Sequence, residues 1–186
     1  MSAGSGIASV AGEFIGRIRQ AGITNMRKLF AFMCVALTAG CGLLPWSTVN
    51  RVSNADGDTY SGSWKYDTAN GEGTMTFADG SKYTGGWRDG KPTGEGTVNF
   101  SDGSTFTGSW DHGSASGSGT MKYANKDKYT GAWQHGKFHG HGVLLLHDGS
   151  AYEGEFEHGM FHGAGTMLNA DGSKETGQWH HGQLEH

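Results

Sequence analysis

The sequence predicts an all-β fold, an elongated single-layer twisted antiparallel sheet made of tandem β-hairpins. A pattern of aromatic residues and glycines recurs every 23 residues from Tyr60 to the C-terminus. Within each unit the patterned residues are spaced by two, which is the period of a β-strand. The chain holds 34 glycines and only 2 prolines, without a collagen period. Glycine is therefore predicted to have a repeated backbone role in the sheet.

An export signal is predicted over residues 26–40, ahead of the repeats. Arg27 and Lys28 precede twelve uncharged residues, 29–40, and Cys41 follows them. This order of cations, apolar run and small residues is typical of an export signal. A helix of that length covers roughly 18 Å, well short of the ~30 Å hydrocarbon core of a bilayer. The run is therefore too short to span a membrane comfortably.

Residues 37–41, with the sequence LTAGC, resemble a bacterial lipobox. The resemblance implies that the sulfur of Cys41 carries a diacylglycerol and that the chain is cut before this residue. Two or three acyl chains hold a protein firmly on a membrane surface. Gly42 favours the outer membrane or periplasm over the inner membrane. Two alternatives stay open: Cys41 follows a simple cleaved signal, or the apolar run is an uncleaved anchor.

The segments on either side of the predicted signal do not share its pattern. Met26 is placed where an export signal starts, so residues 1–25 are interpreted as an overextended reading frame. The alternative is a leader with an amphipathic helix over residues 12–21. Pro45 and the turn-forming run 54–58 predict a linker over residues 41–59.

The repeat domain is predicted over residues 60–186. Each unit begins with an aromatic residue, has a glycine two residues later and a second aromatic residue after two more. Glu175 and Phe156 are the departures from this pattern, at the start of the last unit and at the tryptophan position of the fifth. The units are residues 60–82, 83–105, 106–128, 129–151, 152–174 and a partial sixth at 175–186.

The second half of each unit predicts a second strand and a turn. Two glycines spaced by two, such as Gly94 and Gly96, precede alternating apolar residues. The unit then closes on Asp-Gly, a dipeptide suited to positive φ. Lys126 is the departure, because it stands where the other units have glycine.

One face of the predicted sheet is aromatic. Bare backbone at the strand glycines makes room for a ring of the neighbouring strand, so each hairpin is expected to be held by its own aromatic residues. The residues assigned to this aromatic face are Tyr83, Trp87, Phe100, Trp110, Tyr123, Tyr129, Trp133 and Tyr152.

The pattern YxGxWxxGxxxGxG, present at residues 83–96 and 129–142, resembles the MORN (membrane occupation and recognition nexus) repeat. The resemblance covers residues 60–186. It implies hairpins laid side by side in one elongated sheet. It also implies that the repeats themselves are not catalytic, because enzymes that contain such repeats have their catalytic site in an attached domain. With strands about 4.8 Å apart, each hairpin should advance the array by about 9.6 Å.

Charge excludes several classes of partner. Residues 1–40 hold four cations and Glu13, a net charge of +3, so the remaining chain carries −7 of the total of −4. Binding to nucleic acid or to anionic lipid depends on clustered Lys and Arg. The repeat domain is therefore not expected to bind nucleic acid, and its contact with a membrane is expected through the lipid anchor.

Units four and five depart from the others and predict a partner-binding site. The loop before the glycine pair contains Phe138 and His139, and then Phe161 and His162, in these two units. The face opposite the aromatic one, polar in units one to three, becomes apolar at Val143, Leu145 and Leu168. Exposed apolar patches of this kind mark contacts. The alternative is that these residues stiffen a strand and cover the rim of the sheet.

The histidines do not predict a metal site shared between units, and a site within one unit, such as His135 with His139, stays an open alternative. His112, His135, His158 and His181 share one register in the turns. Equivalent atoms of adjacent hairpins lie about 9.6 Å apart, too far for nitrogens that must each lie ~2.1 Å from one zinc ion. No nucleophile motif or catalytic set is recognised, so the chain is predicted to be non-enzymatic and to need no cofactor.

The function predicted from the sequence is an interaction or scaffold module of the cell envelope. An alternative is glycan or peptidoglycan binding, in which the aromatic face stacks on sugar rings. The last unit ends after one strand, 176–179, so its open edge is a template for strand addition by an envelope protein or a second copy.

Overall fold

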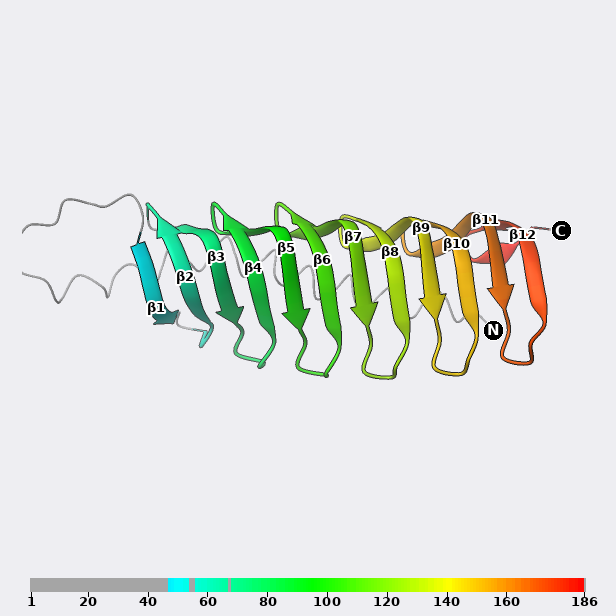
Figure 1. The fold of residues 1–186 in the computed structure, drawn as a ribbon, viewed down its shortest axis with the longest axis horizontal. Helices are drawn as coiled ribbons and strands as arrows, with labels where there is room; N and C mark the ends of the chain where they lie inside the picture. The colour runs from blue at the N-terminus through cyan, green and yellow to red at the C-terminus, as the bar shows by residue number, and fades with distance from the viewer. Residues whose placement is uncertain (1–46, 54–55, 67, 186) are drawn as a thin grey trace, which may run out of the picture.

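The computed structural model describes residues 47–53, 56–66 and 68–185, with the backbone alone for 47–53. They form one antiparallel sheet of 13 strands, whose order in space is their order in the chain (Figure 1). The predicted all-β, single-layer sheet of tandem hairpins is therefore confirmed. The strands are β1 (Ser47–Ser53), β2 (Thr59–Lys65), β3 (Thr68–Thr76), β4 (Lys82–Arg88), β5 (Lys91–Asn99), β6 (Thr105–Asp111), β7 (Ser114–Lys122), β8 (Lys128–Gln134), β9 (Lys137–Leu145), β10 (Ala151–Glu157), β11 (Met160–Leu168), β12 (Lys174–His180) and β13 (Gln183–Leu184).

Two strands lie outside the predicted hairpins. β1 pairs with β2 within the segment that the sequence assigned to a linker. At the other end, β13 pairs with Trp179 and His180, and the Glu185 N–H donates to the Gln178 carbonyl at 2.8 Å. The outer edge of β12 was expected to be open. It is covered by β13 near its end, whereas from residue 174 to 177 no described strand pairs with this outer edge.

The predicted signal segment, Cys41 and the helix expected over 12–21 lie outside the described residues. Within the described ranges, no helix has the length and hydropathy that a membrane crossing requires.

The strands of each hairpin are joined by a turn of two residues. In the second unit these are Asp89 and Gly90, with φ of 49° and 75°. Positive φ at both positions is typical of the type I′ turn, whose twist matches that of a hairpin. The histidines that share one register, His112, His135, His158 and His181, occupy the first turn position of the later units, with φ near 50°.

A turn at each Asp-Gly dipeptide connects one hairpin to the next. The Phe77 N–H donates to the Ser81 carbonyl at 2.8 Å and the Gly80 N–H to the Phe77 carbonyl at 2.9 Å. Gly80 has a φ of 88°, and Lys126 holds the equivalent position with a φ of 76°. Lys126 is therefore strained where the other units have glycine.

Neighbouring units are also joined by a polar side chain at this edge. Ser81 Oγ accepts the Ser101 N–H at 3.1 Å, and Ser104 Oγ accepts the Ala124 N–H at 3.0 Å. Asp58 does the same for the Ala78 N–H at 3.0 Å. These side chains are buried, and each satisfies a backbone donor twenty residues on.

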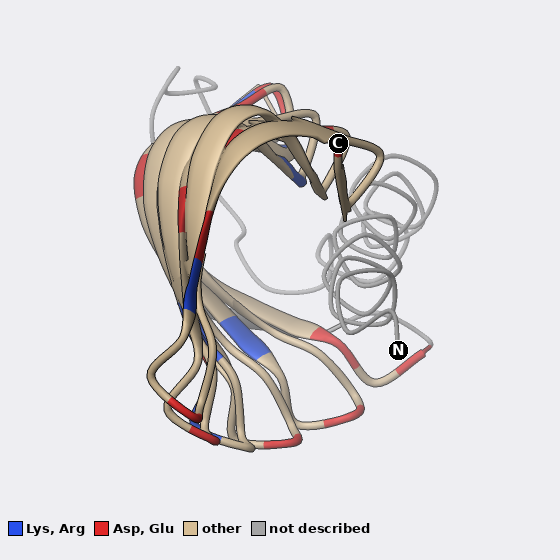
Figure 2. Cartoon of the chain, turned by 90° about the vertical axis from the view of Figure 1, so that its right-hand side faces the viewer, with Lys and Arg blue, Asp and Glu red and all other residues tan. Residues whose placement is uncertain are grey.

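A bulge in the second strand of each hairpin bends the sheet. Gly85 pairs with Gly96, whereas Trp87 pairs with Pro92, so β5 has two residues more than β4 in this stretch. The same register shift recurs at β2–β3, β6–β7, β8–β9 and β10–β11. Bulges bend the strand that carries them. Repeated in every unit, they curve the sheet into a trough (Figure 2).

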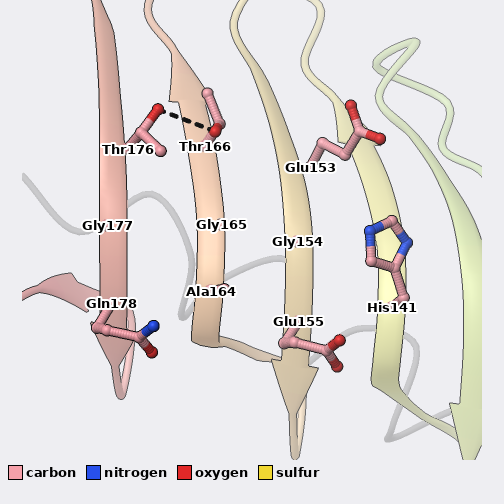
Figure 3. Close-up of a pocket in the computed structure, with 10 residues that line it drawn as sticks. All are labelled: His141, Glu153, Gly154, Glu155, Ala164, Gly165, Thr166, Thr176, Gly177 and Gln178. Carbon is pink, nitrogen blue, oxygen red and sulfur yellow. Dashed lines mark hydrogen bonds between the residues drawn. The ribbon is translucent and has the colours of Figure 1, made fainter.

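The two faces of the trough differ in chemistry. The aromatic core lies on the concave face, because rings four residues apart in one strand, such as Tyr83 and Trp87, meet with centroids 5.2 Å apart only where the strand bends toward them. The residues that alternate with the core, such as Thr166 and Thr176 (Figure 3), therefore lie on the convex face. The period of two in each strand places these two sets on opposite sides.

Candidate docking surface

The concave face is filled by a continuous series of ring contacts. The Tyr83 ring meets Trp87 of its own unit edge to face at 5.2 Å and Trp110 of the next unit at 5.1 Å. Contacts of the same kind run from Tyr60 to Trp179. The rings are buried against each other and against glycine backbone, as predicted. Of the assigned aromatic face, Tyr83, Trp87, Trp110, Tyr129, Trp133 and Tyr152 are buried, and Phe100 and Tyr123 are partly buried beside them.

Most tyrosine hydroxyls and tryptophan N–H groups on this face donate to nearby carbonyls, whereas the buried Nε1–H groups of Trp64 and Trp133 have no hydrogen-bond partner in the described residues. The Tyr83 hydroxyl donates to the Gly86 carbonyl at 3.0 Å, and the Trp87 Nε1–H to the Gly73 carbonyl at 3.2 Å. Burial, followed by the negative charge of Glu155, raises the pKa of Tyr152 to about 12. The hydroxyl of this tyrosine is therefore a neutral hydrogen-bond donor over the physiological pH range.

Phe138 and Phe161, expected on an exposed loop, belong to this core. Phe138 is 3% exposed and stacks on Tyr129 with ring centroids 3.7 Å apart. Phe161 is 7% exposed and stacks on Tyr152 at 3.9 Å. The expectation that these two side chains lie on an exposed loop is wrong, because the preceding turn has only two residues and both phenylalanines are already in strands. Their binding to a partner stays a prediction. Phe138 already lies within β9, opposite Trp133.

His139 lies in the bulge of β9, whereas His162 pairs with Glu155 just before the bulge of β11. The His139 ring is 6.4 Å from that of His158, and His162 Nε2 lies 3.5 Å from Glu157 Oε2. Six residues separate His139 from Leu145, or roughly 20 Å along a strand. The structure therefore does not bring the two histidines together with the apolar residues of the convex face.

Metal binding by these histidines has no structural support. In the described part of the chain, no group of three or more His, Cys, Asp or Glu side chains is arranged to hold a metal ion.

The apolar residues of the convex face do form one surface. Leu145 of β9 and Leu168 of β11 both pair with Ala151 of β10, so the three side chains lie in one row. Val143 is two residues from Leu145 on the same face. We call Val143, Leu145, Ala151 and Leu168 the apolar patch. Leu145 is 44% exposed, a large value for leucine, and the other three are half-buried.

The apolar patch interrupts a regular polar pattern. Where one hairpin meets the next, two threonines on the convex face form a hydrogen bond between their hydroxyls, as Thr97 and Thr107 do at 3.1 Å. The same contact joins Thr74 with Thr84, Thr120 with Thr130, and Thr166 with Thr176. At the β9–β10 junction the equivalent pair is Val143 and Glu153. This junction is the one that departs.

The neighbouring pairs at the same junction also differ. Leu145 pairs with Ala151, where the β7–β8 junction pairs Lys122 with Lys128. His141 pairs with Glu155. His141, Glu153, Glu155 and Ala151 were not recognised from the sequence as site residues. Alternation along the strands is the signal that would have found them. His141 is two residues before Val143 in β9, and Ala151, Glu153 and Glu155 follow one another at steps of two in β10.

An open hollow lies on the same face (Figure 3), and it borders the apolar patch because Glu153 in its lining pairs with Val143. Its volume is about 580 Å³. Glu153 and Glu155 point from β10 toward β9, and His141 of β9, Gln178 of β12 and small residues of β10 to β12 form the rest of its lining (Figure 3). The lining residues are His141, Glu153, Gly154, Glu155, Ala164, Gly165, Thr166, Thr176, Gly177 and Gln178.

Two solved structures resemble the chain weakly. The wild-type TCP10 domain of Danio rerio CPAP is 13% identical, with a TM-score of 0.40; the match covers 69% of this chain and 60% of that domain. The SAS-4 (dCPAP) TCP domain of Drosophila melanogaster, solved with a proline-rich motif of Ana2 (dSTIL), is 8% identical, with a TM-score of 0.38. That match covers 76% of this chain and 95% of the other. No curated protein matches the chain.

The family model described as the MORN repeat matches five consecutive segments. These are residues 60–82, 83–105, 106–128, 129–151 and 152–174, with the boundaries predicted from the sequence. Each matched segment contains one hairpin of the sheet. Because the matches run without a gap over more than half of the chain, the chain belongs to the MORN repeat family.

Proposed function

We propose that this chain is a non-enzymatic docking scaffold of the bacterial cell envelope, in which the convex face of β9 to β11 binds another protein. The observation that supports it best is the local replacement of the polar pairs by the apolar patch. A hydrophobic residue as exposed as Leu145 costs solubility, and contiguous patches of this kind are typical of protein contacts. The repeat family itself indicates a module for interactions.

The concave face is a weaker candidate for binding. Its rings are buried against one another and are not free to stack on sugar rings, so glycan binding through the aromatic face is not favoured by the geometry. The exposed side chain of Leu145 is on the opposite face.

The tether to the membrane in this proposal is a lipid on Cys41. Its support is the sequence alone: two cations, an apolar run and the residues LTAGC before the linker. On this reading the anchored protein belongs to the outer membrane or periplasm. Mass spectrometry of the mature N-terminus tests it, since a diacylated or triacylated Cys41 is expected. An unmodified Cys41, or a chain that still carries residues 26–40, would contradict the lipid anchor.

Photo-crosslinking in the native cell tests the docking face. We expect a photoreactive amino acid at Leu145 to give a discrete adduct with another envelope protein. Asn99 is the matched control, because it occupies the same register and the same face in the second unit. Identical adducts from both positions, or no adduct from position 145, would exclude the apolar patch as the docking face.

A substitution pair provides the complementary test. We expect Leu145→Ser with Leu168→Ser to abolish recovery of the crosslinked protein in a pulldown. The thermal midpoint should change little, because Leu145 is exposed and Leu168 is half-buried on the outer face. Undiminished recovery of the partner by this folded variant would contradict the proposal.

A further inference from the structure

We infer that the protein segment docked on the apolar patch carries a cationic side chain, an arginine by preference, next to its aliphatic residues. The inference rests on the proposed function and names the chemistry of its partner. It starts from the residues that border the patch on the convex face.

Glu153 and Glu155 are the charged neighbours of the patch along β10. Glu153 is exposed and pairs directly with Val143, while Glu155 is half-buried and pairs with His141. The two glutamates project from the same face, because two residues separate them in a strand. An apolar patch therefore has two carboxylates on one flank.

These carboxylates lack a cation in the described part of the chain. The ion pairs found there join His112 with Asp111, His147 with Asp127 and His162 with Glu157. Glu95 of the second unit lies at the level of the sheet where His141 and Glu155 pair in the fourth and fifth units. Its carboxylate instead accepts a hydrogen bond from the Ser109 hydroxyl at 2.6 Å. The negative charge beside the patch is thus available to a partner.

The hollow beside the two carboxylates has room and acceptors for a long cationic side chain. Its floor is made of Ala164 and glycine backbone, and its walls include the Thr166 hydroxyl and the Gln178 amide (Figure 3). A guanidinium offers five N–H donors in a planar fork and binds carboxylates through paired hydrogen bonds. A partner segment could therefore place an aliphatic residue on the patch and an arginine in the neighbouring hollow at the same time.

The patch also has cations at its two ends. Lys128 pairs with Leu145, and Lys174 pairs with Leu168. These lysines disfavour a uniformly basic partner. The surface therefore fits a mixed segment, in which a cation faces β10 and its flanking positions are neutral or acidic.

Selection from a random peptide library identifies the preferred chemistry without assuming a partner. Displayed twelve-residue peptides are selected on the full chain, and those that also bind the Leu145→Ser, Leu168→Ser variant are removed. We expect the remaining peptides to be enriched in Arg or Lys beside Leu, Ile, Val or Phe.

The selected peptides are then measured by fluorescence anisotropy against charge-neutral variants. Glu153→Gln with Glu155→Gln should weaken binding about tenfold, since a hydrogen bond to a charged group is lost. The matched control is Glu72→Gln with Glu95→Gln, which removes two carboxylates from the same face away from the patch and should leave binding unchanged. Replacing the peptide arginine by neutral citrulline should weaken binding to the wild type and have no further effect on the Glu153, Glu155 variant.

The outcomes separate this inference from the proposed function. Patch-dependent peptides without a cation, or equal weakening by both pairs of substitutions, would overturn the inference and leave the docking face intact. If no selected peptide depends on Leu145 and Leu168, both the docking face and its cationic partner are refuted.

Discussion

Beneath the ring of Tyr83, a hydrogen atom is the largest side chain that fits at Gly96. A methyl group there would lie 2.5 Å from the tyrosine hydroxyl oxygen and 2.7 Å from the ring carbon Cε2. The ring cannot retreat, because Trp87 and Trp110 contact it on two sides. The alternation of rings and glycines in the sequence is therefore a steric requirement of the concave face.

Gly96→Ala tests this requirement. We expect it to lower the free energy of unfolding by about 1–3 kcal/mol, the usual cost of an extra methyl group in a packed core. Urea unfolding followed by tryptophan fluorescence measures the loss. Ser118→Ala, at an exposed strand position, should change stability by less than about 0.5 kcal/mol. Equal effects of the two substitutions would show that the ring does not need the bare backbone.

Phe106 is the one unit-starting ring of the full units that lacks a hydroxyl. In the other four units, the tyrosine hydroxyl donates to the carbonyl three residues on, as from Tyr129 to Ala132 at 2.8 Å. Phe106→Tyr would place a hydroxyl near the Ser109 carbonyl. We expect a gain of about 0.5–1.5 kcal/mol in unfolding free energy, measured by urea titration. A decrease would mean that this unit has no room for the oxygen.

At the scale of the element, the contact between consecutive units contains a titratable group at Asp127. This carboxylate is 3% exposed, and its Oδ1 accepts the His147 N–H at 2.8 Å and lies 2.9 Å from His147 Nδ1. Burial opposes its ionisation. The hydrogen bonds from His147 and Asn125 outweigh burial and lower the pKa of Asp127 below its ordinary value.

This shift predicts an acid-sensitive link between the third and fourth units. With a lower pKa in the folded state, the folded protein binds fewer protons than the unfolded chain as the pH falls through the folded and unfolded values. The stabilisation is present above an unfolded pKa of about 3.9 and is lost as the pH falls below it. Urea unfolding from pH 6 to pH 2.5 should show a steeper loss for the wild type than for Asp127→Asn.

Comparison with the variant isolates Asp127 from other carboxylates. Hydrogen bonds from Ser150 and Ser173 also lower the pKa values of Asp148 and Asp171. Both remain in Asp127→Asn. Parallel pH profiles for the two proteins would contradict a role for Asp127.

At the scale of the whole molecule, the repeat pattern predicts the array, because its period and turn dipeptides specify which strands pair. Phe138 shows that the start of the second strand of each hairpin was predicted too late in the sequence. The second strand was expected to begin at the glycine pair, whereas β9 begins at Lys137. Continuing the alternation from Leu144 and Gly142 back to residue 138 would have placed Phe138 on the aromatic face.

The curvature and the first strand were not predictable in the same way. The bulge adds two residues to the second strand, so it leaves the alternation of faces unchanged and has no signature in the spacing. β1 lies outside the repeat pattern and is defined by its pairing with β2. β13 instead begins 23 residues after β11, and Leu184 pairs with Trp179 as Phe161 pairs with Phe156, so extending the period through the last turn would have predicted it. The candidate site was predicted in part: Val143, Leu145 and Leu168 share a surface, while its carboxylates emerge from cross-strand pairing.

Each hairpin contains the same bend and pairs only with its neighbours along the chain. The number of hairpins therefore sets the length of the trough, and the bend within each hairpin sets its cross-section. Duplicating one 23-residue unit would extend the array by about 9.6 Å without widening it. Gene duplication can thus adjust the reach of such a molecule while each docking position keeps its local shape.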